Sequence, residues 1–355
     1  MLRAAGRPAV VEDLVLRPLG PCEVRVRLAA SGVCHTDLSV RDGAMPALLP
    51  CTLGHEGAGV VADVGGDVTT VAAGDHVVLT WNVPCRRCRD CLRGDPQLCA
   101  HGLDHAFGVP YAASAAGSVW PSMGAGTLAE YTLLPAAAVV PVDRSLPLHQ
   151  AALLGCAVIT GVGAALRSAA VRPGESVLVI GCGGVGLAAI QGARLAGAGR
   201  IIAVDMVGSK LNLAKEFGAT DVVDAKAGDP VAQVIEMTKG GVHHSFEAVG
   251  LKKTAEQAFK MLARGGTANV IGMIPLGQTI ELHGADFLGE KRIQGCAMGS
   301  NRFPVDMPRL VDFYLSGKLK LDDMISRRIK LKEVNEAFDE LKRGEIARSV
   351  IVFDA

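Results

Sequence analysis

Four cysteines within one short segment have spacing that suits a metal. They stand as C-x2-C-x2-C-x7-C at Cys85, Cys88, Cys91 and Cys99, in a stretch rich in arginine, aspartate and glycine. Zinc takes four ligands in a tetrahedron, and two-residue spacers let neighbouring cysteines turn around one ion. Four thiolates leave no coordination position for a substrate, so the spacing predicts a structural zinc. Ligation of an iron–sulfur cluster is the competing interpretation, because the spacing is similar to ferredoxin motifs.

A second set of metal-binding residue types is dispersed along the chain. Cys34 lies in VCHTD, His55 in GHEGAGVV and Cys156 in LLGCAVITG. Two cysteines and one histidine leave the fourth position of a zinc ion open, which is the ligand pattern of a catalytic zinc. A cysteine in an apolar run is more often a small buried side chain than a ligand. Spacing alone therefore leaves a second zinc as a hypothesis.

A glycine-rich turn points to a dinucleotide. Gly181, Gly183 and Gly186 form G-x-G-x-x-G between the apolar run SVLVI and the helical stretch GLAAIQGARLA. This is the strand–turn–helix context that the fingerprint requires. The first glycine allows the tight turn, the second lets the backbone approach a pyrophosphate, and the third permits close helix–strand packing. A glycine turn without a ligand is the alternative.

An acidic residue downstream bears on which dinucleotide binds. Asp205 ends the apolar run IIAVD, about 20 residues after the glycine turn, where a carboxylate accepts hydrogen bonds from the adenosine ribose. The same carboxylate would repel a 2′-phosphate, and Met206 and Val207 provide no neighbouring arginine to accept one. The sequence therefore favours NAD over NADP.

The order of elements predicts an α/β protein with two domains. Residues 1 to about 155 contain short apolar runs separated by Gly, Pro and Asp, which is typical of β-strands. From Ser176 onward, buried-strand runs alternate with helical stretches, which indicates a parallel sheet wrapped by helices. One such helix is expected to begin at an N-cap Ser209 and end before Gly218, and another to span 254–266, followed by a strand at 268–273. We expect the segment after Cys296 to pack against the N-terminal part, giving domains 1–157 with 296–355, and 158–295.

Composition narrows the class of partner. Lys plus Arg and Asp plus Glu number 36 each, so no charge excess points to nucleic acid or an anionic membrane. We find no apolar run near the roughly 20 residues of a membrane helix, and no signal-peptide pattern at the N-terminus. A cytoplasmic location is expected, and there ten cysteines favour metal binding over disulfides.

Taken together, the motifs resemble those of the zinc-containing medium-chain alcohol dehydrogenases. The resemblance extends from about Ala4 to the C-terminus. The resemblance implies a GroES-like, β-rich catalytic domain and a six-stranded doubly wound Rossmann domain. It also implies two zinc ions per subunit, NAD as cofactor, and interconversion of small-molecule alcohols and aldehydes or ketones by hydride transfer.

The resemblance assigns roles to individual residues. It makes Cys34, His55 and Cys156 the catalytic zinc ligands. Thr36 would be the hydroxyl that accepts the substrate proton, and Asp37 and Glu56 the carboxylates that orient His55 and tune the field at the metal. The cofactor positions that it implies are His35, Gly181, Gly183, Gly184, Val185, Gly186, Asp205, Lys210, Val249, Ile271, Gly272, Met273 and Arg348. The substrate channel would include Met45, Trp81 and Met123.

The chain departs from the family pattern, and two other functions remain open. Ser39 stands where many relatives carry the histidine that passes the proton to solvent. VCHTD and Met123 resemble the branch that oxidises thiol adducts of formaldehyde, yet the basic residue for the thiol's carboxylate finds no match, so this activity is the alternative. A cofactor-binding protein without zinc chemistry is a third interpretation.

The segment between Cys99 and Cys156 is long, and in this it resembles the segment of dimeric relatives. Edge strands around 268–281 are expected to pair across the two-fold axis of a homodimer.

Overall fold

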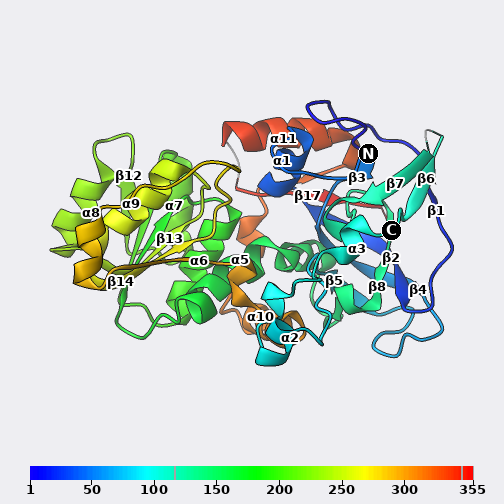
Figure 1. Ribbon diagram of the computed structural model, residues 1–355, viewed down its shortest axis with the longest axis horizontal. Coiled ribbons are helices and arrows are strands. Elements are labelled where there is room, and N and C mark those ends of the chain that lie inside the picture. The colour runs from blue at the N-terminus through cyan, green and yellow to red at the C-terminus, as the bar shows by residue number, and fades with distance from the viewer. Residues whose placement is uncertain (116, 345–346, 355) are drawn as a thin grey trace. The chain divides into compact units, whose positions relative to one another are not determined.

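The computed structural model describes residues 1–115, 117–344 and 347–354 (Figure 1). The chain forms two compact units, Met1–Cys156 with Arg302–Ala355, and Ala157–Asn301. From the sequence, these boundaries were expected after residues 157 and 295. The stretch up to Asn301 belongs to the second unit because the Asn301 side chain donates to the carbonyls of Ile159 and Met298, at 2.6 and 2.5 Å.

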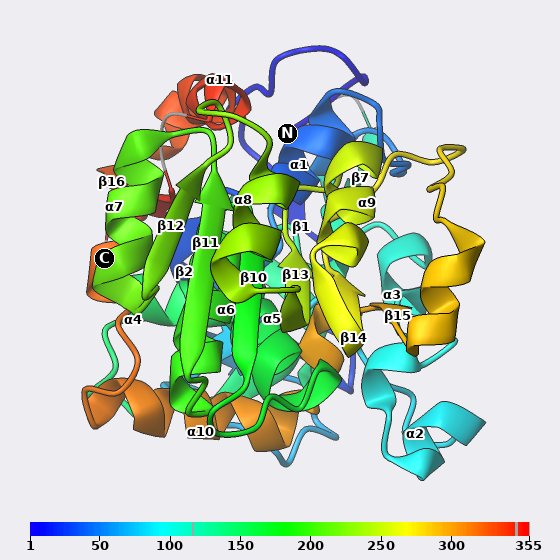
Figure 2. The same ribbon diagram turned by 90° about the vertical axis from the view of Figure 1, so that its left-hand side faces the viewer.

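The second unit is built on a six-stranded parallel sheet with strand order β12-β11-β10-β13-β14-β15 (Figure 2). Its strands are β10 (Ser176–Ile180), β11 (Arg200–Asp205), β12 (Asp221–Asp224), β13 (Val242–Glu247), β14 (Leu262–Val270) and β15 (Arg292–Gly295). Two runs start from β10 and proceed in opposite directions, which is the doubly wound topology. Both faces of the sheet are covered, and Val177 through Ile180 are accordingly all buried.

Five helices accompany this sheet: α5 (Ala157–Gly163), α6 (Gly184–Leu195), α7 (Gly208–Phe217), α8 (Pro230–Thr238) and α9 (Lys252–Lys260). Val234 of α8 and Phe259 of α9 join Ile180, Ile202 and Val204 in one apolar core. Helix α6 packs on β10 and α5, where a Cβ on Gly161 would lie 2.3 Å from the Val185 carbonyl. The expected α/β class with a Rossmann sheet is confirmed.

Three expectations about local elements are wrong. Helix α7 begins at Gly208 with Val207 as its N-cap, because the Asp205 carboxylate already accepts the Val207 N–H at 3.0 Å; Gly218 ends the helix as expected. Helix α9 ends at Lys260, because Leu262 pairs with Val242 and starts β14. The third concerns the edge of the sheet: β14 pairs with both β13 and β15, so β15 is the edge strand and 271–281 contains no strand.

The first unit is built on a seven-stranded sheet of mostly antiparallel strands, in the order β16-β17-β2-β4-β5-β9 with β8 also paired to β2. The strands are β2 (Glu23–Gly32), β4 (Glu56–Val64), β5 (His76–Leu79), β8 (Tyr131–Pro135), β9 (Val139–Pro141), β16 (Arg327–Ile329) and β17 (Ser349–Val352). The C-terminal strand β17 runs antiparallel to β2 and pairs Val350 with Gly32 (Figure 1). Because the two strands run antiparallel, this pairing brings the residue just before β17 beside the residues that follow β2.

In its described part, the first unit also contains a four-stranded sheet and six α-helices. The small sheet contains β1 (Val15–Leu16), β6 (Ala112–Ser114), β7 (Gly117–Pro121) and β3 (Cys51–Thr52). The helices are α1 (His35–Arg41), α2 (Arg89–Arg93), α3 (Asp104–Phe107), α4 (Leu148–Ala151), α10 (Phe303–Leu315) and α11 (Val334–Arg343). Leu38 of α1 shares an apolar core with Val334 and Phe338 of α11 and Ile351 of β17, which fixes α1 directly after β2.

Among the described helices none is by itself long and apolar enough to cross a membrane, although the bent pair Leu148–Gly155 and Ala157–Ser168 passes on length and composition.

Candidate active site

Three of the dispersed residues meet in the first unit. The ligand atoms of Cys34, His55 and Cys156, together with a carboxylate oxygen of Glu56, all lie within 4.8 Å of one another. Cys34 caps the N-terminus of α1 after β2, His55 precedes β4, and Cys156 follows the short helix Ala152–Gly155. The β2–β4 pairing aligns Gly32 with Glu56 and so brings the first two segments together.

The histidine of this group is oriented as a metal ligand. His55 is 1% exposed, and its Nδ1 lies 3.2 Å from the buried carboxylate of Asp37, which also accepts the Gly54 N–H at 2.8 Å. Its Nε2 is buried and has no hydrogen-bond partner in the described part of the chain. A carboxylate on one ring nitrogen fixes the tautomer that leaves the other free to bind a metal. The donor set therefore fits a zinc ion with one open coordination position.

The electrostatics of the group also favour a cation. A hydrogen bond with Cys156, assisted by the charges of His55 and Arg348, holds the pKa of Cys34 well below its usual value. Burial would lower the pKa of His55, but Asp37 and Cys34 together raise it well above the ordinary value. Burial also raises the pKa of Glu56 to about 7. The negative charges of Cys34 and Asp37 thus both act on His55, where a bound metal ion would also feel them.

Glu56 and Arg348 form a buried ion pair at the rim of this cluster. Arg348 hydrogen-bonds the Glu56 carboxylate and donates to the Val33 carbonyl at 3.1 Å, and the two residues are 3% and 0% exposed. A Cβ on Gly32 would lie 2.1 Å from Glu56 Oε2, so only glycine leaves room for the carboxylate. The pairing β17–β2 thus places Arg348 beside the metal ligands, a contact that the sequence did not predict.

Helix α1 supplies further candidate residues on the same turn. Thr36 lies two residues beyond Cys34 and is half-buried, whereas His35 is exposed and Ser39 is half-buried. The Ser39 carbonyl accepts the N–H groups of Ala44 and Met45 at 2.8 and 3.1 Å. The Thr36 hydroxyl thus lies in the first turn of a short helix whose N-cap residue, Cys34, is a candidate metal ligand.

The predicted channel residues differ in their surroundings. Trp81 lies edge-on to His55 with ring centroids 6.5 Å apart, and its Nε1 has no partner among the described residues. Met45 packs against the apolar core of α1 and α11. Met123 is half-buried with a left-handed φ of 52°. The geometry thus places Trp81 against one candidate metal ligand and leaves the roles of the two methionines as predictions.

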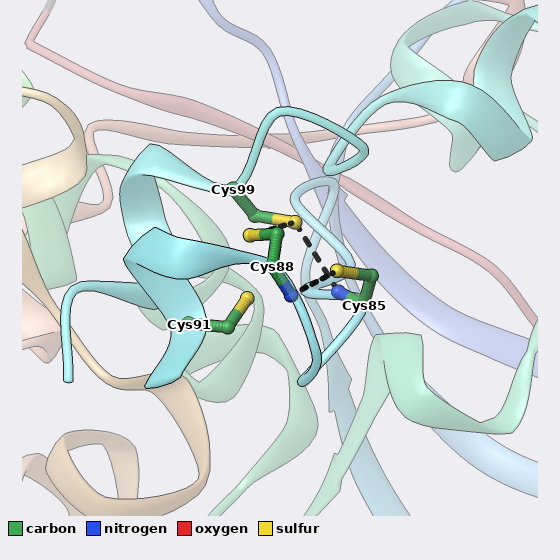
Figure 3. A group of neighbouring side chains, drawn as sticks. All are labelled: Cys85, Cys88, Cys91 and Cys99. Carbon is green, nitrogen blue, oxygen red and sulfur yellow. Dashed lines mark hydrogen bonds between the residues drawn. The ribbon is translucent and has the colours of Figure 1, made fainter. Parts of the chain in front are cut away.

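The four-cysteine lobe folds around a second point. Cys85, Cys88, Cys91 and Cys99 direct their sulfur atoms toward one another, and all four lie within 4.8 Å (Figure 3). Backbone N–H groups donate to two of the sulfurs, from Cys85 to Cys99 at 3.2 Å and from Cys88 to Cys85 at 3.3 Å. Such donors stabilise thiolates, and a hydrogen bond from the backbone of Cys91 lowers the pKa of Cys88 to about 6.

The sulfur separations distinguish the two candidate metals. Four sulfurs at about 2.3 Å from one zinc ion lie about 3.8 Å apart, and the Cys88 and Cys99 sulfurs are 3.8 Å apart. A cluster with several iron atoms between its cysteines needs a wider ring of sulfurs. The geometry therefore fits a single zinc ion in a closed site.

The glycine fingerprint of the second unit has the geometry of a dinucleotide-binding turn. Gly181 follows β10 with φ 92°, and a Cβ on Gly186 would lie 1.7 Å from the Gly181 carbonyl. Gly183 caps α6, and a Cβ there would meet nothing within 4 Å, which leaves its backbone open to a ligand. Gly184 and Val185 begin α6, whose N–H groups suit a phosphate.

Asp205 lies beside this turn at the end of β11. Its two carboxylate oxygens accept the N–H groups of Cys182, at 2.7 Å, and Val207, at 3.0 Å. A carboxylate offers about four acceptor positions, so hydroxyl groups can still bind. Lys210 is half-buried in the first turns of α7. The carboxylate is thus anchored at the carboxyl end of β11, beside the glycine turn that contains Gly183.

The two loops after β13 and β14 carry the remaining predicted cofactor positions. Val249 is 47% exposed and lies against Gly181, where its Cγ2 would be 2.6 Å from an added Cβ. Ile271 and Gly272 both donate their N–H groups to the Glu247 carbonyl at 2.9 Å, and Met273 is 51% exposed. Glu247, which holds these loops together, was missed in the sequence, where it is one acidic residue at the end of HHSFE.

Comparisons with known proteins agree with this geometry. A family model described as alcohol dehydrogenase GroES-like domain matches residues 20–144, and one described as zinc-binding dehydrogenase matches residues 184–316. An S-(hydroxymethyl)glutathione dehydrogenase of Saccharomyces cerevisiae is 37% identical over 364 residues, covering 99% of this chain and 94% of the relative.

Two solved structures resemble the whole chain. An alcohol dehydrogenase zinc-binding domain protein from Burkholderia ambifaria has a TM-score of 0.95 and 37% identity, covering 100% of this chain and 98% of that one. Benzyl alcohol dehydrogenase from Acinetobacter calcoaceticus has a TM-score of 0.89 and 36% identity, covering 96% and 94%. The relatives, the two matching domains and the zinc-compatible cysteine groups agree, and the chain belongs to the zinc-containing alcohol dehydrogenases, oxidoreductases of the medium-chain family.

Proposed function

We propose that this enzyme oxidises small alcohols to aldehydes or ketones with NAD+, and runs the reverse reduction. The observation that carries the proposal is the buried set Cys34, His55 and Cys156, in which Asp37 holds one nitrogen of His55 and the other nitrogen has no partner among the residues that the structure describes. Three protein ligands with one open position distinguish a catalytic from a structural zinc.

The residues of the first unit have separate tasks in this reaction. A zinc ion held by Cys34, His55 and Cys156 would supply Lewis-acid chemistry, which lowers the pKa of a substrate hydroxyl and polarises a carbonyl. Asp37 keeps His55 in its metal-binding tautomer. Thr36 accepts the proton of the substrate hydroxyl and passes it on. Glu56 balances the buried charge of Arg348, which keeps that cation from opposing the metal.

The second unit binds the cofactor in this proposal. NAD supplies the hydride acceptor, while the protein orients it and excludes competing reactions. The N–H groups at the start of α6 and the open backbone of Gly183 receive the pyrophosphate, and Asp205 receives the adenosine ribose. Lys210 is assigned to the same ribose, and His35 and Arg348 to the pyrophosphate, on the family resemblance.

Two classes of substrate are candidates for this enzyme. The relative named S-(hydroxymethyl)glutathione dehydrogenase favours a thiol adduct of formaldehyde, and the solved benzyl alcohol dehydrogenase favours an aromatic alcohol. Trp81, edge-on to His55, supports an apolar or aromatic substrate near the metal. We therefore rank simple alcohols first and the adduct second.

An assay of the purified enzyme decides between them. Aliphatic, allylic and benzylic alcohols are tested with NAD+, beside formaldehyde with and without glutathione. Turnover of an alcohol without added thiol supports the first candidate. Activity that depends strictly on formaldehyde plus glutathione supports the second, and the absence of any NAD+ reduction contradicts both.

Ser39 gives an expected pH effect. Histidine titrates near 6.5, whereas a serine hydroxyl is far too weak a base near neutral pH. Ser39→His should therefore raise alcohol oxidation more at about pH 6–7 than at about pH 9, where hydroxide can accept the proton; general-base assistance is worth up to roughly 10²–10⁴-fold when proton transfer limits the rate. Rates measured across this range with protonated and deuterated alcohol test it. An unchanged pH profile while hydride transfer limits turnover would mean that the proton leaves by another route.

The assembly is expected to be a homodimer. Within the described part of the second unit, β15 is an edge strand, and Leu276 and Leu288 are 82% and 85% exposed. An edge strand and exposed leucines in the same unit are suited to pairing across a two-fold axis. Light scattering should give about twice 36.8 kDa, and Leu288→Glu should shift the mass toward the monomer. A wild-type monomer or tetramer contradicts the proposal.

A cytoplasmic location is part of the same proposal. Six of the seven proposed zinc ligands are cysteines, which bind metal only as reduced thiolates. A reducing compartment keeps them in that state.

A further inference from the structure

The carboxyl edge of the six-stranded sheet contains a buried acid outside the known fingerprint. Glu247 ends β13, is 0% exposed, and pairs in register with Ile180 of β10 and Val270 of β14. Ile180 directly precedes Gly181, so Glu247 lies level with the glycine turn. Strands β10 and β13 are the neighbours at which the chain topology changes direction, and open α/β sheets bind ligands outside the strand ends at this point.

One residue here holds two loops. Glu247 Oε1 accepts the N–H groups of Val249 and Gly250, at 3.0 and 2.8 Å, and the hydroxyl of Thr254 at 2.7 Å. The backbone carbonyl of Glu247 accepts the N–H groups of Ile271 and Gly272. The loop after β13 and the loop after β14 are therefore both fastened to Glu247.

The two loops touch each other through glycines around this carboxylate. A Cβ on Gly272 would lie 2.1 Å from the Gly250 nitrogen and 2.5 Å from Glu247 Oε2, and a Cβ on Gly250 would lie 2.7 Å from the Met273 carbonyl. Glu247 Oε2 itself is buried and has no hydrogen-bond partner among the residues that the structure describes. Burying a carboxylate with one unpaired oxygen costs free energy, which the three hydrogen bonds to its other oxygen offset in part.

We propose that Glu247 is a positioning residue for the nicotinamide half of the cofactor. It acts through the backbone of Val249 and of Ile271 to Met273, which it fixes, and does not touch the reacting atoms. This inference rests on the proposed function. The contacts assigned to the other half of the cofactor, at Gly183 and Asp205, involve no bond to Glu247. Loss of the carboxylate should therefore affect one half of the dinucleotide and spare the other.

Two ligands separate these halves experimentally. ADP-ribose carries the adenosine, the pyrophosphate and the second ribose without the nicotinamide ring, whereas NADH carries all of them. Calorimetric titration of the zinc-loaded enzyme with each ligand gives two dissociation constants. The Glu247→Gln variant keeps the side-chain volume but replaces the carboxylate by an amide. The matched control is Glu281→Gln, because Glu281 is an exposed acid in the same unit that pairs with Lys252.

Glu247→Gln should weaken NADH by roughly 10- to 100-fold, the loss expected for charge-assisted bonds, and leave ADP-ribose within about twofold. The deuterium isotope effect on kcat should rise, because a loosely held ring slows hydride transfer. Thr254→Val removes one of the three donors with little change of shape, and should weaken NADH by roughly two- to tenfold. It provides the same comparison if Glu247→Gln folds poorly. The control should match the wild type.

Two results would overturn the inference. Equal weakening of NADH and ADP-ribose would make Glu247 a general support of the fold, and unchanged NADH affinity together with an unchanged isotope effect would leave it without a role in positioning. A wild-type enzyme that binds neither ligand would overturn the proposed function itself, which distinguishes the two failures.

Discussion

Replacing Cys156 by alanine is expected to reduce the zinc content from two ions per chain to one and to abolish alcohol oxidation. Cys156 is one of the three proposed ligands of the catalytic zinc, whose donor atoms lie within 4.8 Å of one another, and alanine offers no donor. Lewis-acid assistance by a metal is worth several kcal/mol, and each 1.36 kcal/mol is tenfold in rate, so kcat should fall by at least about 10³-fold. The remaining zinc is expected in the four-cysteine lobe, which shares no ligand with this site.

Metal analysis by mass spectrometry and steady-state kinetics test this together, with circular dichroism to check that the fold is retained. Cys22→Ala is the matched control, because Cys22 is an exposed cysteine of the same unit outside both groups. It should keep two zinc ions and full activity. A Cys156→Ala enzyme with two zinc ions or near wild-type turnover would show that Cys156 is not a ligand of the catalytic metal.

Removing the charge of Asp205 is expected to remove most of the preference of the enzyme for NAD+ over NADP+. A hydrogen bond to a charged group contributes about 1.5–3 kcal/mol, so its loss should lower kcat/KM for NAD+ by roughly 10- to 100-fold. The same change relieves repulsion of the 2′-phosphate. The ratio of kcat/KM for the two cofactors should therefore fall by about 10²-fold or more.

The structure shapes the choice of variant. The carboxylate also accepts the N–H groups of Cys182 and Val207, so Asp205→Gly would open room for the phosphate but loosen the glycine turn. Asp205→Asn removes the charge and keeps one acceptor oxygen, so it retains one of these two N–H bonds instead of losing both. Comparing both variants separates the two effects, and Asp224→Asn, at the end of the neighbouring strand β12, is the control. Equal efficiency of the wild-type enzyme with both cofactors would contradict the assignment of Asp205.

Where the decisive contacts are local, the sequence was a good guide. The four cysteines of the lobe lie within one short loop, so their spacing alone predicted that one ion could gather them, and their sulfurs do converge. The glycine turn behaves in the same way, because the φ of Gly181 and the close approach of Gly186 are properties of adjacent residues. The alternation of buried strands and helices likewise predicted the Rossmann sheet.

Local reasoning failed where a neighbour far along the chain decided the outcome. Residues 262–266 look helical, yet they form β14 because Leu262 pairs with Val242. Ser209 looks like a helix cap, yet the Asp205 carboxylate already binds the N–H of Val207, and α7 begins at Gly208. The strand expected at the edge of the sheet is covered by β15.

The two domain types, the closed cysteine lobe and the dinucleotide turn could be predicted from the sequence, because covalent spacing and backbone conformation specify these features within a few residues. The convergence of Cys34, His55 and Cys156 was expected from the family resemblance but not from their spacing, and the pairing of Arg348 with Glu56 and the bonds from Glu247 to two loops were not expected at all. Strand pairing between β2, β4 and β17, and between β10, β13 and β14, makes these contacts. No local pattern encodes such pairing, because its free energy comes from burying surfaces contributed by distant segments.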